Sequence, residues 1–417
     1  MGAGLHERYV CALIAEMRAS GLPRNGSAGG RIDTVYIGGG TPTALPPSLL
    51  CKLLREVQQL NLASDAEITL EMNPSTNQLS ALAEYARHGV NRLSIGLQAW
   101  QDKFLRGLKR AHTAAEFTQT MHAAREAGID NINVDLMFSL PWQSMWHWRE
   151  SITQVIAHAP QHISAYSLTP AENTPLWDAI EAGKLTLPSE KADREMYHEA
   201  IRMFTAAGYE HYELSNFAKP GYKSRHNVDC WRRKPYLGLG LGAHSFDGEK
   251  RFRNTMDMRR YLDAWGSPPD ESPSQAKPPS LEGGGPKGRG LALTYHSLQP
   301  PPPKAAPPSK EGGIQAKSGF DTTDKTGKVT PPPCTHEDIE VLTKQDAMAE
   351  TMFLGLRMTK GVSTNEFYKR FGIHLTDCYG TELKLLTAKG LITCTPERVA
   401  LTPLGLDLAN QVFEVFI

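Results

Sequence analysis

The sequence predicts an α/β protein in which a parallel sheet or barrel is followed by a small C-terminal module of helices and a β-hairpin. Short runs of β-branched and apolar residues alternate with amphipathic helical stretches over the first two thirds of the chain. The spacing from one run to the next is about 25 to 40 residues, which is typical of β/α units. A proline-rich stretch then separates this region from the C-terminal part.

The predicted strands are the short apolar runs before that stretch, and the predicted helices lie before and between them. The strands comprise residues 34–37, 67–71, 92–97, 131–138 and 162–168. The helices comprise residues 7–19, 47–60, 78–88, 102–107, 114–127 and 146–157. Within 78–88, Leu79, Leu82 and Ala86 fall at helical spacing. Gly89 follows as a C-terminal stop, as helix ends commonly require.

The proline-rich stretch is predicted to be a disordered insertion over residues 267–335. Residues 267–333 hold 15 of the 29 prolines and few large apolar residues. Such a composition cannot bury enough surface to offset the entropy of ordering the chain. A polyproline tendency is expected around the proline runs, and a docking site for a proline-recognition domain stays open as an alternative.

The C-terminal part, residues 336–417, resembles a winged-helix module. An amphipathic helix is predicted over 337–358, with Ile339, Leu342 and Met352 on its apolar face. The further elements are helices 365–371 and 378–389 and a strand pair at 391–393 and 399–401. The last helix offers few basic residues, which favours a structural or regulatory role over DNA binding.

Composition excludes several classes of function. The 417 residues carry 45 basic and 45 acidic side chains, a balance that argues against a nucleic-acid binder. No apolar run approaches the roughly 20 residues of a membrane-spanning helix. Six cysteines stand singly, which points to a reducing compartment rather than a disulfide framework. The first residues resemble neither a signal sequence nor a transit peptide.

The sharpest local motif is Gly38-Gly39-Gly40-Thr41-Pro42, directly after a predicted strand. Glycines allow a backbone to approach a ligand closely, and the carboxyl ends of parallel strands are where α/β folds place their sites. For the three glycines alone, a tight turn of flexible glycines is the interpretation that we favour. The motif does not fit the phosphate loop of nucleotide hydrolases.

Polar residues recur at the ends of later strands. Glu71 ends the run 67–71, Gln98 follows 92–97, and Asp135 interrupts the apolar strand 131–138. An acid inside an apolar strand is costly to bury unless it is paired, which makes Asp135 a candidate site residue. Each residue alone is more typical of a satisfied core or cap position, so their recurrence carries the argument.

Taken in order, five motifs resemble the radical S-adenosylmethionine family, and within it the HemW-type haem chaperones. They are YIGGGTP, LEMNP, RLSIGLQ with LKRAH soon after, NINVDLMFSLP and ISAYSLTPAENTPL. The resemblance implies a partial (β/α)₆ barrel over residues 1–175 that lacks its first strand. It also implies a barrel extension over residues 176–266 and a C-terminal domain of the same family over residues 336–417.

The resemblance implies a site for S-adenosylmethionine. Gly38, Gly39, Gly40, Thr41 and Pro42 match the loop that holds its amino group. The polar contacts to the same ligand match Glu71, Gln98, Arg110 and Asp135. The chemistry agrees, because acids suit an ammonium group and ribose hydroxyls, and arginine suits a carboxylate.

A second implied site is for haem. Residues 225–231 (RHNVDCW) resemble the HNxxYW signature of HemW-type proteins, in which the histidine is implicated in haem binding. His226 would ligate haem iron through a neutral imidazole nitrogen. Cys230 stands where the family has tyrosine, which puts the haem environment in doubt. Without the family, His226 would be interpreted as a capping or surface residue.

The family's CxxxCxxC loop, which holds a 4Fe-4S cluster, is absent from this sequence. Two explanations stay open. In the first, which we favour, the chain starts at a downstream methionine of a longer protein that carries the loop. In the second, the protein has lost the cluster and persists as a binder. A chain with this sequence is not expected to bind the cluster or to cleave S-adenosylmethionine.

The resulting hypothesis is a haem chaperone with haem and a recipient haem protein as its partners. An oxygen-independent coproporphyrinogen III dehydrogenase is the enzymatic alternative, and a non-catalytic interaction protein built on a degenerate barrel is the other. A homodimer stays open. The resemblance implies a mitochondrial or plastid location in a eukaryote and a cytoplasmic one otherwise.

Overall fold

A computed structural model describes residues 3–27, 30–74, 76–266, 292–293 and 335–417 of the chain. These residues divide into two compact units. Unit 1 comprises Met1–Ala66, Leu237–Ser245 and Phe252–Ile339, and unit 2 comprises Glu67–Tyr236, Phe246–Arg251 and Glu340–Ile417. Most of the predicted disordered insertion, residues 267–335, lies outside the described residues.

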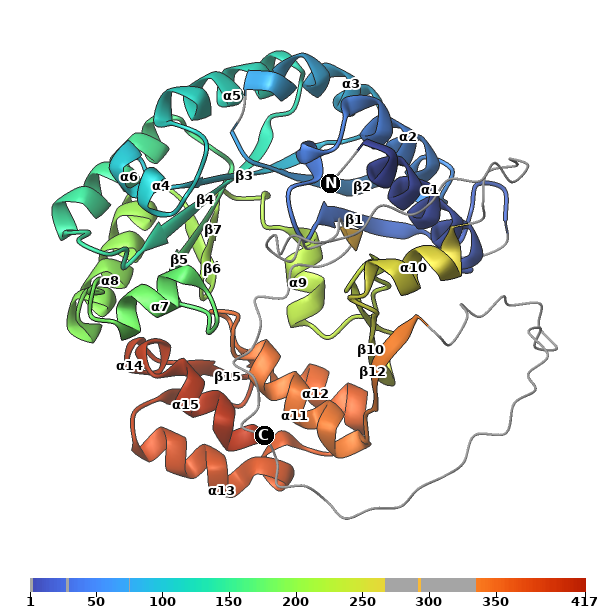
Figure 1. Ribbon diagram of the computed structural model, residues 1–417. Coiled ribbons are helices and arrows are strands. Elements are labelled where there is room, and N and C mark those ends of the chain that lie inside the picture. Colours follow the sequence, from blue (N-terminus) through green and yellow to red (C-terminus); the bar gives the residue numbers. More distant parts are fainter. Residues whose placement is uncertain (1–2, 28–29, 75, 267–291, 294–334) are drawn as a thin grey trace. The chain divides into compact units, whose positions relative to one another are not determined.

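Unit 2 contains the repeated β/α units that the spacing predicts (Figure 1). Its strands are β2 (Leu62–Met72, from Glu67 on), β3 (Arg92–Gln98), β4 (Asn131–Phe138), β5 (His162–Ser167), β6 (Glu210–Glu213) and β7 (Asn216–Ala218). Their order is β6-β7-β5-β4-β3-β2. The strands β2 to β5 are mutually parallel, and β7 joins β5 in the antiparallel sense. The α/β class with a partial barrel is confirmed.

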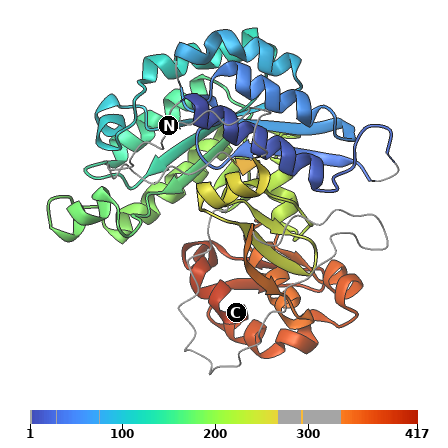
Figure 2. The same ribbon diagram turned by 45° about the vertical axis from the view of Figure 1, so that its right-hand side comes forward.

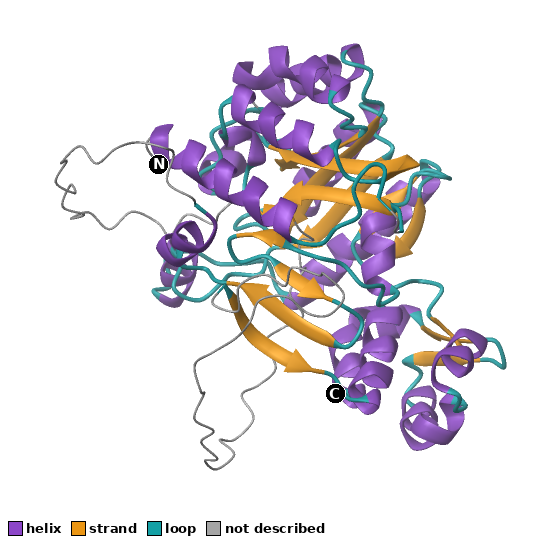
Figure 3. Ribbon diagram, turned by 90° about the vertical axis from the view of Figure 1, so that its right-hand side faces the viewer, coloured by secondary structure: helices purple, strands orange, loops and turns teal. Residues whose placement is uncertain are grey.

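Helices cover the outer face of this sheet, and Figure 3 shows them in purple against the orange strands. They are α3 (Leu82–Arg87), α4 (Asp102–Gly107), α5 (Ala114–Glu126), α6 (Met145–Ala157), α7 (Pro175–Glu181) and α8 (Glu190–Ala206). The predicted helix 78–88 is shorter than expected, because its first residues form the 3-10 helix η2 (Thr76–Ala81). A capping box between Thr113 and Glu116 begins α5 where the sequence predicts it.

The core between sheet and helices is apolar and closely packed. Val134 and Leu136 of β4 are fully buried, as are Phe117 of α5 and Trp148 of α6. The Trp148 indole nitrogen donates to the backbone oxygen of Met196 at 2.8 Å, so this large side chain is buried without an unsatisfied donor. The core therefore holds the strands rigidly, and polar side chains at their ends keep fixed positions.

The C-terminal part of unit 2 forms a second core, and its helices appear in orange and red in Figure 2. Its elements are α11 (Lys344–Gly355), β13 (Val362–Ser363), α12 (Thr364–Phe371), α13 (Leu375–Ala388), β14 (Ile392–Cys394), β15 (Arg398–Leu401), α14 (Pro403–Asp407), α15 (Ala409–Phe413) and η3 (Glu414–Phe416). The sheet order is β13-β15-β14. Helices α11, α12 and α13 and the β14–β15 hairpin are present, as predicted for a winged-helix-like module, and α14 and α15 follow them.

The predicted helix over 337–358 is wrong in its first part. Residues His336–Val341 form strand β12, and α11 begins only at Lys344. Thr343 caps α11 through a capping box with Asp346, which fixes the helix start at that point. Ile339 lies on the strand, more than half exposed, so its helical spacing with later apolar residues has no structural meaning.

Unit 1 contains α1 (Ala3–Ala19), β1 (Ile32–Gly38), η1 (Pro42–Ala44), α2 (Pro47–Val57), the first residues of β2, β8 (Leu239–Gly240), α10 (Met258–Trp265) and β11 (Ala292–Leu293). The short strand β9 (His244–Phe246) and strand β10 (Lys250–Asn254) contribute residues to both units. Among the residues described, no helix is both long and apolar enough to cross a membrane.

A buried carboxylate organises unit 1. Glu16 of α1 accepts hydrogen bonds from the Gly240 backbone nitrogen at 2.8 Å and the Asn254 amide at 2.6 Å. The Tyr261 hydroxyl donates to the same carboxylate at 2.5 Å. Burial raises the pKa of Glu16, although these three hydrogen bonds act in the opposite direction. The Gly238–Gly242 stretch is thereby tied to α1 and α10.

Candidate functional site

The register of the parallel strands brings polar residues of unit 2 into lateral rows. One row follows Glu71, Ser94, Asn133 and His162, and the next follows Gly96, Asp135 and Ser164. Aligned residues on neighbouring parallel strands point to the same side of the sheet. The alternation of Asn131, Asn133 and Asp135 along β4 is the sequence signal from which this polar face could have been predicted.

Four predicted ligand contacts gather around Tyr166 of β5. The Tyr166 hydroxyl donates to Gln98 Oε1 at 2.8 Å. Burial raises the pKa of Tyr166, as do the negative charges of Asp135 and Glu71, whereas the positive charge of Arg110 lowers it. Glu71, Gln98, Arg110 and Asp135 therefore lie near one another at the carboxyl ends of the strands. Tyr166 itself is not among the residues predicted from the sequence.

The backbone at this place is shaped for close approach. A Cβ on Gly96 would lie 2.9 Å from Gln98 Nε2 and 3.2 Å from Asn73 Oδ1, so a larger residue there would displace the Gln98 amide. Arg110 donates to the same Asn73 oxygen at 3.4 Å. Gln98 has a φ of 71°, a left-handed value that is costly for a side chain of its size. Such strain is concentrated at functional sites in proteins.

The loop Gly38–Pro42 belongs to unit 1. It begins at Gly38, the last residue of β1, and leads into η1, where Pro42 is the first residue. Gly39 has a φ of 87°, which requires glycine, whereas Gly38 and Pro42 are buried. Gly40 is exposed and Thr41 is half-buried, so the loop keeps part of its backbone open to solvent.

The donor set in unit 2 suits a zwitterionic ligand with hydroxyl groups. Two carboxylates accept hydrogen bonds from ammonium and hydroxyl groups, and a guanidinium pairs with a carboxylate. Gln98 adds an amide that both donates and accepts. These residues fit the polar groups of S-adenosylmethionine.

His226 lies on α9 (Arg225–Trp231), a seven-residue helix of unit 2. Its side chain is buried, with 8% of the residue exposed. Burial lowers the pKa of His226 to about 4, and the positive charge of Arg92 acts in the same direction. The imidazole is therefore neutral, the form that ligates metals. Its donor chemistry fits haem iron, but the closed position leaves a haem no access.

Glu67 of β2 holds the start of α9. Its carboxylate accepts from the backbone nitrogens of Arg225 and His226, each at 3.2 Å. Glu67 precedes Glu71 by four residues on the same strand, a rise of about 13 Å. The candidate haem ligand thus lies nearer the amino-terminal end of β2 than the predicted ligand contact Glu71 does. The sequence does not predict this separation.

The other end of α9 is held by the C-terminal elements. Arg357 places its guanidinium 4.4 Å from the centre of the Trp231 ring. Just beyond α9, Arg233 Nε pairs with the carboxylate of Glu350 on α11 at 2.5 Å. Cys230, which stands where the HemW-type signature has tyrosine, is buried on the same helix. The helix that carries His226 is therefore anchored at both ends.

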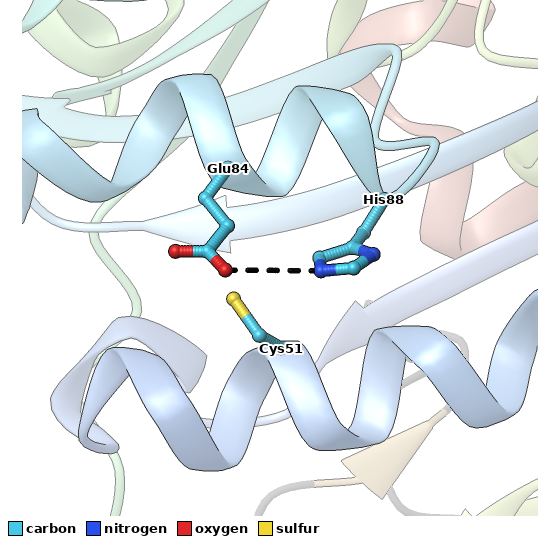
Figure 4. A group of neighbouring side chains, drawn as sticks. All are labelled: Cys51, Glu84 and His88. Carbon is cyan, nitrogen blue, oxygen red and sulfur yellow. Dashed lines mark ion pairs between the residues drawn. The ribbon is translucent and has the colours of Figure 1, made fainter.

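The described cysteines do not form a cluster site. They lie on five separate elements, namely Cys11 on α1, Cys51 on α2, Cys230 on α9, Cys378 on α13 and Cys394 on β14. Cys334 is outside the described residues. Figure 4 draws Cys51 of unit 1 and an ion pair of unit 2, at 3.9 Å between Glu84 of α3 and His88, the residue that caps the end of α3. The cysteines in the described part of the chain therefore do not fit a 4Fe-4S cluster.

Comparison with protein families finds two matching regions. Residues 23–155 match the radical SAM superfamily. Residues 342–408 match the HemN C-terminal domain. The two matches cover β1 to α6 and α11 to α14, the parts that carry the predicted ligand contacts and the second core.

Comparison with curated proteins finds relatives along almost the entire chain. The chain is 32% identical over 413 residues to "Heme chaperone HemW" of Bacillus subtilis, covering 99% of this chain and 91% of that protein. It is 39% identical over 215 residues to the zebrafish (Danio rerio) "Radical S-adenosyl methionine domain-containing protein 1, mitochondrial". The second match covers 51% of this chain and 48% of the relative.

Comparison with solved structures finds the same fold in an enzyme. The coproporphyrinogen III oxidase HemN of Escherichia coli superposes with a TM-score of 0.70 at 20% identity. The match covers 99% of this chain and 83% of the enzyme. At this identity the likeness concerns the fold alone, and it agrees with the partial barrel and C-terminal module described above.

Proposed function

This chain belongs to the HemW family of radical S-adenosylmethionine proteins, and from that premise we propose that it is a haem chaperone, which binds haem and delivers it to haem proteins. The observation that carries the proposal is helix α9. It holds a histidine whose imidazole is neutral at physiological pH. The Bacillus subtilis relative that matches 99% of this chain is named a haem chaperone.

Haem ligation by His226 requires α9 to turn outward. With 8% of the residue exposed, the ring offers no open face to a planar macrocycle of haem's size. Helix α9 has only seven residues, so it can turn as one piece. Its start is anchored by the hydrogen bonds from the backbone nitrogens of Arg225 and His226 to Glu67. We propose that these anchors open when haem binds.

The ligand site around Tyr166 is proposed to bind S-adenosylmethionine. Arg110 would pair with its carboxylate, and Glu71 and Asp135 would accept from its ammonium and ribose hydroxyls. Gln98 would orient its adenosine through the side-chain amide. Residues Gly38–Pro42 of unit 1 are proposed to hold the amino group. The recipient is proposed to be a haem protein of the same compartment, which is mitochondrial or plastid in a eukaryote and cytoplasmic otherwise.

A haem titration tests the function. The full chain and its His226→Ala variant are titrated with haem, and the Soret band is followed. We expect a shifted Soret band in the parent and at least a tenfold loss of affinity in the variant, because the axial ligand is gone. His122→Ala, which removes an exposed histidine of α5, is the matched control and should titrate like the parent.

Two results would count against the proposal. A parent protein that leaves the Soret band of free haem unchanged would remove the haem function. Equal titrations of parent and His226→Ala would keep haem binding but assign it to another residue. Far-UV circular dichroism of each variant separates loss of the ligand from loss of the fold.

A further inference from the structure

A buried row of hydrogen bonds crosses the interior of unit 2 from the ligand site to the haem segment. Asn133 Nδ2 donates to Asp135 Oδ1 at 2.7 Å. Asn133 Oδ1 lies 2.6 Å from His162 Nδ1, and His162 Nε2 lies 2.7 Å from the Tyr212 hydroxyl. The backbone of Ser224 lies against that same hydroxyl. Ser224 is the residue that caps α9.

The carboxylate at one end determines the direction of every proton in this row. A carboxylate only accepts hydrogen bonds, so the Asn133 amide nitrogen must face Asp135. The Asn133 oxygen then faces His162 Nδ1, which must therefore carry the ring proton. His162 Nε2 is left as an acceptor, and the Tyr212 hydroxyl donates to it. The phenolic oxygen in turn faces the Ser224 backbone.

The row is isolated from bulk solvent. Asn133 and Tyr212 are each 2% exposed, and His162 and Ser224 are fully buried. Burial lowers the pKa of His162 well below its ordinary value, and the positive charge of Arg92 adds to that effect, so the ring stays neutral with one donor and one acceptor. Hydrogen bonds in such surroundings polarise one another along a chain, and a change at one end is felt at the other.

We propose that this row, from Asp135 through Asn133, His162 and Tyr212 to Ser224, couples ligand binding at Asp135 to the opening of α9. The inference rests on the proposed function, in which S-adenosylmethionine binds near Asp135 and haem binds His226. Asn133, His162 and Tyr212 act as positioning residues, since they touch neither ligand. Full negative charge on Asp135 tightens the row and holds α9 closed.

The sign of the coupling follows from the chemistry of the ligand. Ribose hydroxyls and an ammonium group donate hydrogen bonds to a carboxylate and reduce its strength as an acceptor for Asn133. The row then weakens step by step up to the Ser224 backbone, and α9 opens more often. A bound S-adenosylmethionine thus favours exposure of His226.

Hydrogen exchange of the ligand-free full chain tests the coupling. Exchange is measured by mass spectrometry on the segment 224–231 in the parent and in Asp135→Asn. We expect the variant to exchange about fivefold faster there, the size of one net hydrogen bond lost. Glu71→Gln is the matched control, because it neutralises the other carboxylate at the same end of the sheet and should leave α9 unchanged. The segment 114–126 of α5 reports any global loosening.

A second variant shows whether the effect travels along the row. Tyr212→Phe keeps the ring and removes the hydroxyl, so the row is cut beside α9. In this background Asp135→Asn should add nothing to the exchange of segment 224–231. A further measurement, ¹⁵N NMR of the His162 ring, should show a protonated Nδ1 in the parent.

The coupling is refuted by three results. One is equal exchange of α9 in Asp135→Asn and Glu71→Gln, and another is an undiminished effect of Asp135→Asn in the Tyr212→Phe background. The third is the opposite ring tautomer of His162. These measurements use no haem, so a protein that fails to bind haem would remove the proposed function and leave the coupling to be judged by exchange alone.

Discussion

Replacing Glu350 by glutamine should lower the free energy of unfolding by about 3 kcal/mol. The Glu350 carboxylate, 10% exposed, pairs with Arg233 and Arg251 at 2.5 Å each. The Arg233 side chain is only 7% exposed, so the variant leaves a buried guanidinium without its counter-charge. Breaking a buried ion pair from one side costs about 3 to 5 kcal/mol.

The lower end of that range applies here for two structural reasons. Arg251 is 28% exposed and can recover part of its hydration. Both guanidiniums also lie over the Phe246 ring, at 4.4 and 4.6 Å from its centre, a contact that the variant keeps. A loss of about 3 kcal/mol raises the unfolded fraction about 150-fold at 25 °C, which a urea titration resolves easily.

The assay is urea denaturation followed by circular dichroism and tryptophan fluorescence. The matched control is Glu195→Gln on α8, whose carboxylate is 57% exposed and lies 3.9 Å from Lys191. We expect the control to change the stability by less than about 0.5 kcal/mol. A loss below about 1 kcal/mol for Glu350→Gln would refute the argument, because it would mean that Arg233 is solvated or paired in another way.

Three further predictions concern stability. Hydrogen bonds from Arg202 and Arg149 lower the pKa of Glu199 to about 2, against burial, so its stabilisation is present above about pH 5 and is lost as the pH falls through 2. Glu199→Gln should therefore cost about 1 kcal/mol at pH 7 and much less at pH 2 in urea titrations, after allowance for the exposed arginines. The pKa of Glu16 is raised, so the stability of the protein should fall as the pH rises above the ordinary pKa of a glutamate. Melting temperatures measured over a pH series should change less with pH in Glu16→Gln than in the parent, and an equal slope would contradict this. Gly361→Ala should cost more than about 3 kcal/mol, because its Cβ would lie 2.0 Å from the Val399 oxygen, whereas Gly372→Ala, with a similar positive φ and open space, should cost about 1 kcal/mol by thermal melting. Similar losses for the two glycines would show that backbone strain alone determines the cost.

Local sequence patterns predict the elements whose residues interact mainly with their neighbours in the chain. Strand β4 and helix α4 have the predicted bounds, because an apolar run or an amphipathic turn is enough to define each of them. The helix expected over 337–358 fails where a cap overrides periodicity. Thr343 and Asp346 fix the start of α11, and the apolar spacing before them belongs to a strand.

The residues of the candidate site also differ in whether local sequence predicts them. Glu71, Gln98 and Asp135 are found from their places at strand ends, since parallel strands bring those ends together. The burial of His226 could not be predicted, because it depends on Glu67, a residue 159 positions away. Tyr212 reaches His162 across 50 residues, and no local pattern reports such a contact.

If His226 ligates haem as proposed, its burial makes haem affinity a property of the whole fold rather than of the ligand contacts alone. A site that binds only in its open form has an apparent dissociation constant equal to the intrinsic one divided by the open fraction. If α9 is open about one part in a hundred, then haem binds about a hundredfold more weakly than the exposed site would allow. A recipient protein that competes for haem benefits from the same hundredfold weakening, because closure of α9 disfavours the haem-bound form. Under this proposal one equilibrium controls both retention and release of haem, and a substitution far from the iron would shift both.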